Sequence, residues 1–200
     1  MTAAIETGGY THGARWLEMS PAPGQMEAPV DPEDFRSPRA APGPFQSPEV
    51  LGALAPAVHE AWRLVARKQG WTPAWDMPFA DLPEDVKGFN RAAARRMPEN
   101  LALVGLSLEP GKATAKAETA VRAVLERHME TLAEAEHRGW MAHLIAEGWT
   151  FGRPRDNAAK RHDCLRPYRD LSPAEKDKDR DSVRHYPDFA RLAGFRVVGV

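Results

Sequence analysis

The second half of the chain repeats the first, and this internal repeat restricts the folds that the sequence can adopt. Residues 54–62, LAPAVHEAW, align with residues 132–140, LAEAEHRGW. After an insertion in the second half, residues 78–82, PFADL, align with residues 167–171, PYRDL. Each copy has an apolar face too small to fold alone. We therefore expect the two copies to pack about a pseudo-twofold axis, with a cleft where they meet.

Each copy has the pattern of a helix, a loop, a second helix and a strand. In the first copy, apolar spacing and capping residues predict helices over residues 48–70 and 82–97, and a short apolar run predicts a strand over residues 101–108. In the second, we expect one long helix over residues 114–147, a helix that starts at a capping box at residue 172, and a strand over residues 194–200. The sequence predicts a mainly α protein with short β-strands, built from two repeats related by a pseudo-twofold axis.

The first 47 residues differ from the rest in composition. Eight prolines lie between Pro21 and Pro48, and proline interrupts both helices and sheet ladders. We expect an extended proline-rich arm over residues 1–47. The first repeat then covers residues 48–110 and the second residues 114–200, with the helix over residues 114–147 leading into it and both repeats in one module.

Charge and composition exclude several classes of protein. The formal net charge is −1, so the chain has no general basic field for DNA, RNA or an anionic membrane. It has a single cysteine and no apolar run of about 18 residues, the length that a membrane span needs. The first ten residues lack the pattern of a secretory signal. We therefore expect a cytoplasmic protein with no nucleic-acid partner and no membrane span.

Short motifs in the second copy resemble the ryanodine-receptor repeat (RyR) domain. They are H-x-x-W from His137, G-W-T-F-G from Gly148, P-R-D from Pro154, K-R-H from Lys160 and C-L-x-P-Y from Cys164. The resemblance covers about residues 132–200. The first copy looks like a degenerate repeat that keeps the helices and lacks the loop motifs.

The resemblance implies a function as well as a fold. RyR domains are regarded as ligand-binding or regulatory modules, they are not known as enzymes, and bacterial proteins that carry them are similar in size to this chain. The paired form looks like a binder of adenine nucleotides, with the purine between the tryptophans of the H-x-x-W motifs. Transferred to this chain, that implies stacking on Trp62 and Trp140 and a phosphate contact from Arg155.

The insertion in the second copy makes the two halves unequal. Residues 150–163 contain four Arg or Lys residues and two Asp residues. Two equivalent rings can share a purine, but its phosphates point only one way, so we expect one ligand per chain with its anionic end toward the second repeat. The candidates for this contact are Arg153, Arg155, Lys160 and Arg161. The alternative is that they are ordinary solvated charges.

Histidines and charged residues complete the set of candidates. His59 and His137 each precede a tryptophan by one helical turn, and each either makes a structural hydrogen bond to a loop or binds a ribose or phosphate. His162 ends the basic K-R-H motif. The histidines lack metal-ligand spacing with Cys164, so we expect no metal site. Residues 175–181 alternate in charge sign, a pattern that favours a solvated helix face.

The sequence therefore favours a non-enzymatic protein that binds an adenine-containing nucleotide, such as ATP, ADP or an ADP-ribose-type signal, in the cleft between the repeats. It would act as a sensor or a sequestering module, and no cofactor is expected besides this ligand. Two alternatives stay open. One is a protein–protein interaction module without a small-molecule ligand. The other is a nucleotide-processing enzyme with His137 or Asp156 as its base.

Overall fold

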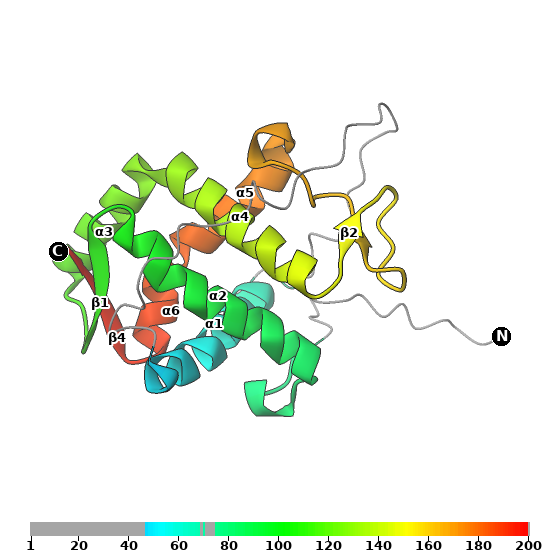
Figure 1. Ribbon diagram of the computed structural model, residues 1–200. Coiled ribbons are helices and arrows are strands. Elements are labelled where there is room, and N and C mark those ends of the chain that lie inside the picture. The colour runs from blue at the N-terminus through cyan, green and yellow to red at the C-terminus, as the bar shows by residue number, and fades with distance from the viewer. Residues whose placement is uncertain (1–46, 69, 71–74, 200) are drawn as a thin grey trace.

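The computed structural model describes residues 47–68, 70 and 75–199 (Figure 1). The predicted arm over residues 1–47 falls outside this part of the chain, apart from Ser47. The described residues are mainly helical with a few short strands, which confirms the predicted fold class. No helix among them is both long enough and apolar enough to cross a membrane.

The elements follow the predicted order in both halves. The first half contains α1 (Pro48–Lys68), the short 3-10 helix η4 (Phe79–Asp81), α2 (Glu84–Ala102) and β1 (Leu106–Pro110). The second half contains α3 (Ala115–Arg127), α4 (Met129–Ala146), β2 (Thr150–Phe151), β3 (Arg161–His162), η5 (Tyr168–Asp170), α5 (Pro173–Arg184), α6 (Tyr186–Leu192) and β4 (Phe195–Gly199). The predicted capping box is present, because Ser172 and Glu175 exchange side-chain and backbone hydrogen bonds at the start of α5.

The first predicted strand begins later in the chain than expected. We placed it over residues 101–108, but α2 continues through Pro98 to Ala102. Proline removes one hydrogen bond from a helix. Here packing against the core keeps the turn after Pro98 helical, because Leu101 is fully buried. The strand starts only after Gly105, whose positive φ of 69° suits glycine.

The long helix predicted over residues 114–147 is two helices. The break lies at His128, which leaves helical geometry with φ −111° and ψ 19°. A straight helix of that length would span about 50 Å, more than a small domain can cover with its core. The break lets Leu125 of α3 and Leu132 of α4 reach the same core.

One hydrophobic core joins the two halves. It contains Leu54 from α1 and Met97 from α2 together with Leu132 from α4 and Tyr186 from α6. All four side chains are almost fully removed from solvent. The two predicted repeats therefore do not form separate domains.

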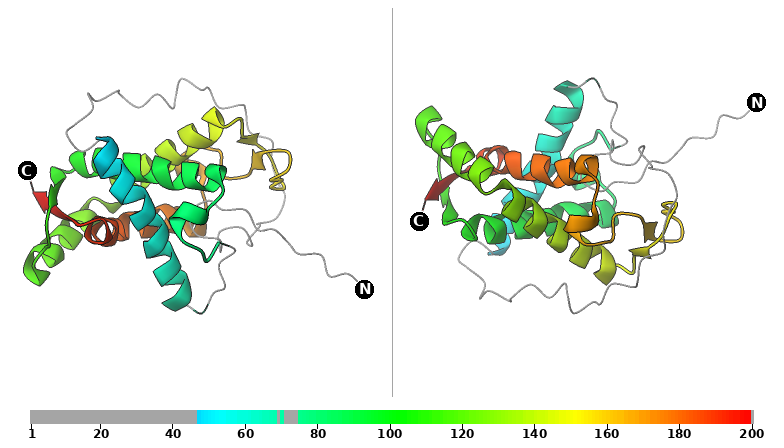
Figure 2. Two further views of the ribbon diagram at one scale, coloured as in Figure 1. Left: turned by 90° about the horizontal axis from the view of Figure 1, so that it is seen from below. Right: turned by 90° about the horizontal axis from the view of Figure 1, so that it is seen from above.

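The strands β1 and β4 pair antiparallel at one end of the molecule, opposite the loop that carries β2 and β3 (Figures 1 and 2). Leu108 pairs with Val197, the residue to which the sequence alignment matches it. Leu106 pairs with Gly199, and the equivalent residues in the other half, Phe195 and Pro110, form the pair at the other end of the ladder. A twofold axis through the central pair would exchange these two outer pairs.

The histidines of the two H-x-x-W motifs make equivalent contacts. His59 Nε2 lies 2.8 Å from the carbonyl oxygen of Met77. His137 Nε2 lies 2.9 Å from the carbonyl oxygen of Arg166, the residue aligned with Met77. Each imidazole thus bridges its helix to the loop that precedes the 3-10 helix.

Candidate functional site

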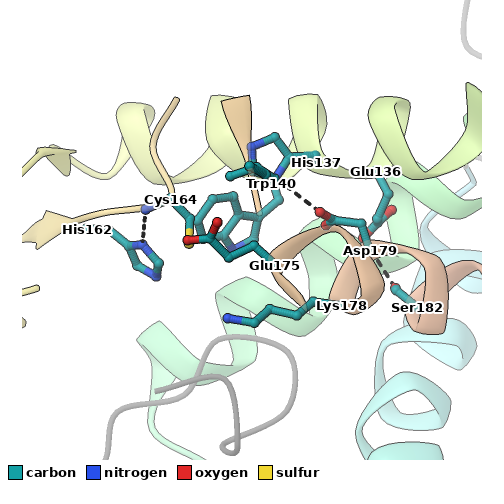
Figure 3. Close-up of a pocket in the computed structure, with 10 residues that line it drawn as sticks. Glu136, His137, Trp140, His162, Cys164, Glu175, Lys178, Asp179 and Ser182 are labelled. Atoms are coloured by element: carbon teal, nitrogen blue, oxygen red, sulfur yellow. Dashed lines mark hydrogen bonds and ion pairs between the residues drawn. The ribbon is translucent and has the colours of Figure 1, made fainter. Parts of the chain in front are cut away.

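A small pocket of about 50 Å³, partly open to solvent, lies between α4, α5 and the segment around β3 (Figure 3). Its lining residues are Glu136, His137 and Trp140 from α4, His162 from β3, Cys164 and Leu171 from the following loops, and Glu175, Lys178, Asp179 and Ser182 from α5. All of them belong to the second predicted repeat.

The indole of Trp140 forms one wall of the pocket. It packs against the buried residues Leu144 and Leu165. The ring of His162 meets it edge-on at 4.9 Å, and that of His137 lies 5.4 Å away, both measured between ring centroids. The indole is held on several sides and still lines the pocket, so it offers a preorganised face for a planar ligand.

His137 is fixed at both ring nitrogens. Nε2 donates to the carbonyl oxygen of Arg166, and Nδ1 lies 3.2 Å from Oδ2 of Asp179. Burial raises the pKa of Asp179, and the hydrogen bond from His137 opposes that shift. The residue aligned with Asp179 in the first repeat is Asn90, which bonds to the carbonyl of Val86 instead. This histidine–carboxyl contact therefore belongs to the second repeat.

His162 lies between two hydrogen-bond donors. The backbone N–H of Cys164 is 3.0 Å from its Nδ1, and Nη1 of Arg155 is 3.0 Å from its Nε2. Burial and then the charge of Arg155 lower the pKa of His162 to about 3, so the ring is neutral at pH 7. A neutral imidazole accepts at one nitrogen only. The guanidinium of Arg155 can only donate, so Nε2 accepts from it, and the ring proton then lies on Nδ1, 3.4 Å from Oδ1 of Asp163.

Arg155 is a half-buried cation beside the pocket. Its Nε donates to Oδ1 of Asn157 at 2.7 Å. Within the described part of the chain, no carboxylate forms an ion pair with it. Burial lowers the pKa of Arg155, as expected for a guanidinium that has lost water without gaining a full counter-charge.

Arg155 contacts His162 but is not itself among the residues that line the pocket, and the three other basic residues predicted from the loop do not line it either. Arg153 lies over the ring of the exposed Phe151, 5.9 Å from its centroid. Lys160 Nζ donates to the carbonyl of Glu147, and Arg161 pairs with Asp156. All three side chains are exposed.

Trp62 and His59 also lie outside the residues that line the pocket. The indole of Trp62 packs in a cluster of the first repeat with Leu82 and Val86. Its ring stacks near that of His59, with centroids 6.3 Å apart. The structure therefore brings Trp140, His137, His162 and Arg155 together and places the tryptophan of the first repeat elsewhere.

The prediction of a solvated face for residues 175–181 is wrong for one side of α5. Glu175, Lys178, Asp179 and Ser182 all line the pocket. Their spacing of three, four and seven residues from Glu175 marks a single helix face. This spacing can be read from the sequence, but the alternating charges favoured a helix exposed to solvent on all sides.

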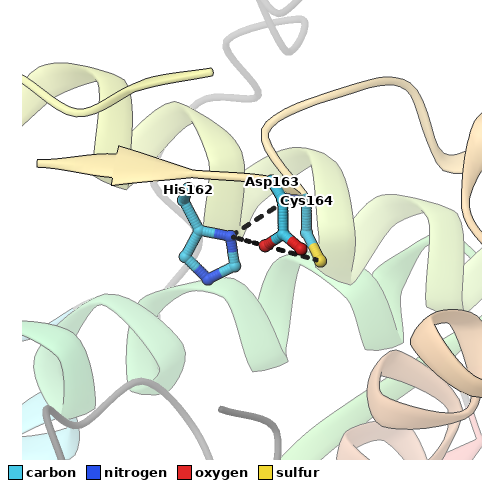
Figure 4. Close-up of side chains that lie close together, drawn as sticks. All are labelled: His162, Asp163 and Cys164. Carbon is cyan, nitrogen blue, oxygen red and sulfur yellow. Dashed lines mark hydrogen bonds and ion pairs between the residues drawn. The ribbon is translucent and has the colours of Figure 1, made fainter. Parts of the chain in front are cut away.

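Three neighbouring side chains offer possible metal ligands (Figure 4). The ligand atoms of His162, Asp163 and Cys164 lie within 4.8 Å of one another. However, Nδ1 of His162 already faces the N–H of Cys164, and a metal-binding thiol must lose its proton. Burial raises the pKa of the Cys164 thiol far above its ordinary value. We therefore assign no metal to this group.

The neutral state of His162 predicts how stability changes with pH. Unfolding returns the imidazole to a pKa of about 6.5, so below that pH the unfolded chain binds more protons than the folded one. Stability should fall by about 1.4 kcal/mol for each pH unit below 6.5 until the folded pKa is approached. Urea unfolding at pH 7 and pH 5 measures this loss. His162→Gln should lose about 2 kcal/mol less than the wild type between these values, and an identical loss in both proteins would contradict the assignment.

The family model of the RyR domain matches residues 113–198. The match runs from the turn before α3 to β4 and includes every residue that lines the pocket. It confirms the family that the motifs of the second copy indicated.

Proposed function

Because the chain contains a RyR domain, we propose that it is a non-enzymatic binding protein whose pocket takes an adenine-containing nucleotide. The base stacks on Trp140, and the phosphates point toward Arg155. The protein acts as a sensor or a sequestering module for this nucleotide. The ligand class comes from the resemblance of the motifs, and the geometry of the pocket supplies the orientation.

The carrying observation is the guanidinium of Arg155 beside His162. A half-buried guanidinium without a carboxylate partner stands 3.0 Å from a pocket-lining imidazole that is neutral at pH 7. A phosphate oxygen beside the guanidinium accepts from its remaining N–H groups and neutralises its charge, and charge-assisted contacts of this kind are the strong ones. Lys178, also in the pocket lining, adds a second positive charge on the side of α5.

The remaining pocket surface suits the base rather than the phosphates. Glu136 and Glu175 are each already paired with an arginine, Arg96 and Arg166. The indole of Trp140 lies beside these carboxylates and presents an aromatic face. Stacking of one base on such a face contributes about 1–3 kcal/mol, which together with charge-assisted contacts suits an affinity in the micromolar range.

We further propose that residues 48–110 are a degenerate first repeat of the RyR type. The symmetric β1–β4 register and the equivalent contacts of His59 and His137 support this. The basic loop has no counterpart in the first repeat, so the proposal keeps one nucleotide per chain.

The positions of the two candidate bases support binding without catalysis. Nε2 of His137 is bonded to the carbonyl of Arg166 and does not face a substrate. Asp156 lies on the loop, where it accepts from the backbone of Ala159 and from Arg161. These contacts fit structural roles for both residues, so the proposal contains no chemical step.

Titration calorimetry with ATP, ADP, ADP-ribose and adenosine tests the proposal. Arg155→Met should reduce the affinity for ATP by about tenfold or more, because a charged hydrogen bond is lost, and should leave that for adenosine nearly unchanged. Arg153→Met, on the same loop but exposed, is the matched control and should bind ATP like the wild type. Equal losses in the two variants would rule out a specific phosphate contact. If the wild type binds none of these compounds but co-purifies with one specific protein, the interaction module is the better description.

A further inference from the structure

Glu136, in the wall of the pocket, holds a buried hydrogen-bond network. Its Oε1 accepts from Nη2 of Arg96 at 2.8 Å and lies 3.5 Å from Oγ of Ser182. Its Oε2 accepts from Asn100 at 3.1 Å and from the hydroxyl of Tyr186 at 2.9 Å. The donors come from α2, α5 and α6, so one carboxylate of α4 joins the pocket helices to the first half of the chain.

Arg96 also packs directly on the helix that carries Trp140. A Cβ atom built on Gly139 would stand 2.2 Å from Cδ of Arg96 and 3.0 Å from its Cγ. No real side chain tolerates such a distance, so only glycine lets the arginine stem lie across α4 at this point. Gly139 is the residue immediately before Trp140 and two after His137.

We infer that Arg96 is a positioning residue for the ligand pocket, although it lies outside the region that matches the RyR family. Its stem packs in the notch at Gly139, and its guanidinium holds Glu136. Together these contacts set the rotation and depth of the turn of α4 that carries His137 and Trp140. The first repeat, which supplies no residue to the pocket lining, thereby fixes the geometry of the site in the second. This inference rests on the proposed function, since it assigns Arg96 a role in nucleotide binding.

The test is Gly139→Ala, with Gly88→Ala in α2 as the matched control. A Cβ at Gly88 meets nothing within 4 Å. Gly139→Ala should displace Arg96 and reduce the affinity for ATP by about tenfold or more, because binding groups must be held to about 0.5 Å. Gly88→Ala should bind ATP within about twofold of the wild type, since nothing has to move. Both affinities are measured at a temperature at which urea titration shows the variants to be folded.

A second readout separates positioning from general stability and does not need a ligand. The NMR signals of the Trp140 indole N–H and of the His137 imidazole should shift in Gly139→Ala and stay in place in Gly88→Ala. In an Arg96→Ala background, Gly139→Ala should cause no further shift, because the clash has gone. If Arg96→Ala does not fold, the positioning role is judged from the NMR shifts of Gly139→Ala and Gly88→Ala alone.

The outcomes of the two proposals are distinguishable. If the wild type binds none of the adenine compounds tested, the proposed function is wrong, and the NMR shifts alone test the role of Arg96. If ATP binds but Gly139→Ala matches Gly88→Ala in both affinity and NMR signals, the positioning role is overturned and the nucleotide site stands.

Discussion

Trp140→Leu is expected to lower the affinity for ATP and for adenosine by about the same factor, on the order of ten- to a hundredfold. The indole supplies the stacking face for the base, and such a contact contributes about 1–3 kcal/mol. Leucine keeps much of the packing against Leu144 and Leu165 but offers no aromatic face. Calorimetry with both compounds measures the effect. An equal loss for the two ligands places the residue at the base, whereas a loss for ATP alone is the pattern expected of Arg155→Met.

Trp62→Leu is the matched control for this prediction. Trp62 is also a partly buried tryptophan at the equivalent place in its repeat, but it packs with Leu82 and Val86 away from the pocket lining. The Trp62→Leu variant should be less stable than the wild type and should keep its affinity for ATP. If both variants lose affinity equally, the sequence-based prediction of a purine between two indoles is right, and the single-face site is wrong. If neither loses affinity, the base does not stack on Trp140.

The internal repeat allowed much of the fold to be predicted. Apolar spacing and the capping box at Ser172 are local signals, so they located the helices and the start of α5. The pairing of the two strands, with Leu108 opposite Val197, was not predicted, because strand pairing depends on contacts between residues distant in the sequence. The errors occurred where tertiary packing overrides local preference, as at Pro98, where the buried Leu101 keeps α2 helical.

The site was harder to predict, because two residues that align in the sequence can have different neighbours in the structure. Trp62 and Trp140 align, and their neighbouring histidines make the same hydrogen bond. Only the second repeat has the loop that brings His162 edge-on to the indole and Arg155 against His162. The inserted residues thus decide which tryptophan borders the pocket.

The contribution of α5 depends on a helix-packing relation that a single sequence does not display. Lys178 and Asp179 lie in a stretch of alternating charges, which is typical of a solvent-exposed helix. Packing against α4 turns one face of α5 inward, where Asp179 contacts His137 and Ser182 donates to Glu136. Arg96, which lies in the first half of the chain, 40 residues before Glu136, belongs to none of the motifs.

Arg96→Ala is expected to lower the free energy of unfolding by about 3–5 kcal/mol, because it leaves a buried carboxylate without its counter-charge. Glu136 is only 3 % exposed, so water cannot replace the guanidinium without opening the core. Urea unfolding measures the loss. Arg95→Ala is the matched control, since Arg95 is exposed on the same helix, and it should change stability by no more than about 0.5 kcal/mol.

The size of the loss also decides what holds Glu136 in place. Asn100 and Tyr186 still donate to Oε2 when Arg96 is removed. If these two neutral donors are enough, Arg96→Ala will behave like Arg95→Ala, and the ion pair between the halves is dispensable. If the loss reaches the expected range and Arg96→Lys recovers part of it, the positive charge itself holds the pocket wall. The stability of the RyR domain then depends on a residue supplied from outside the matched region.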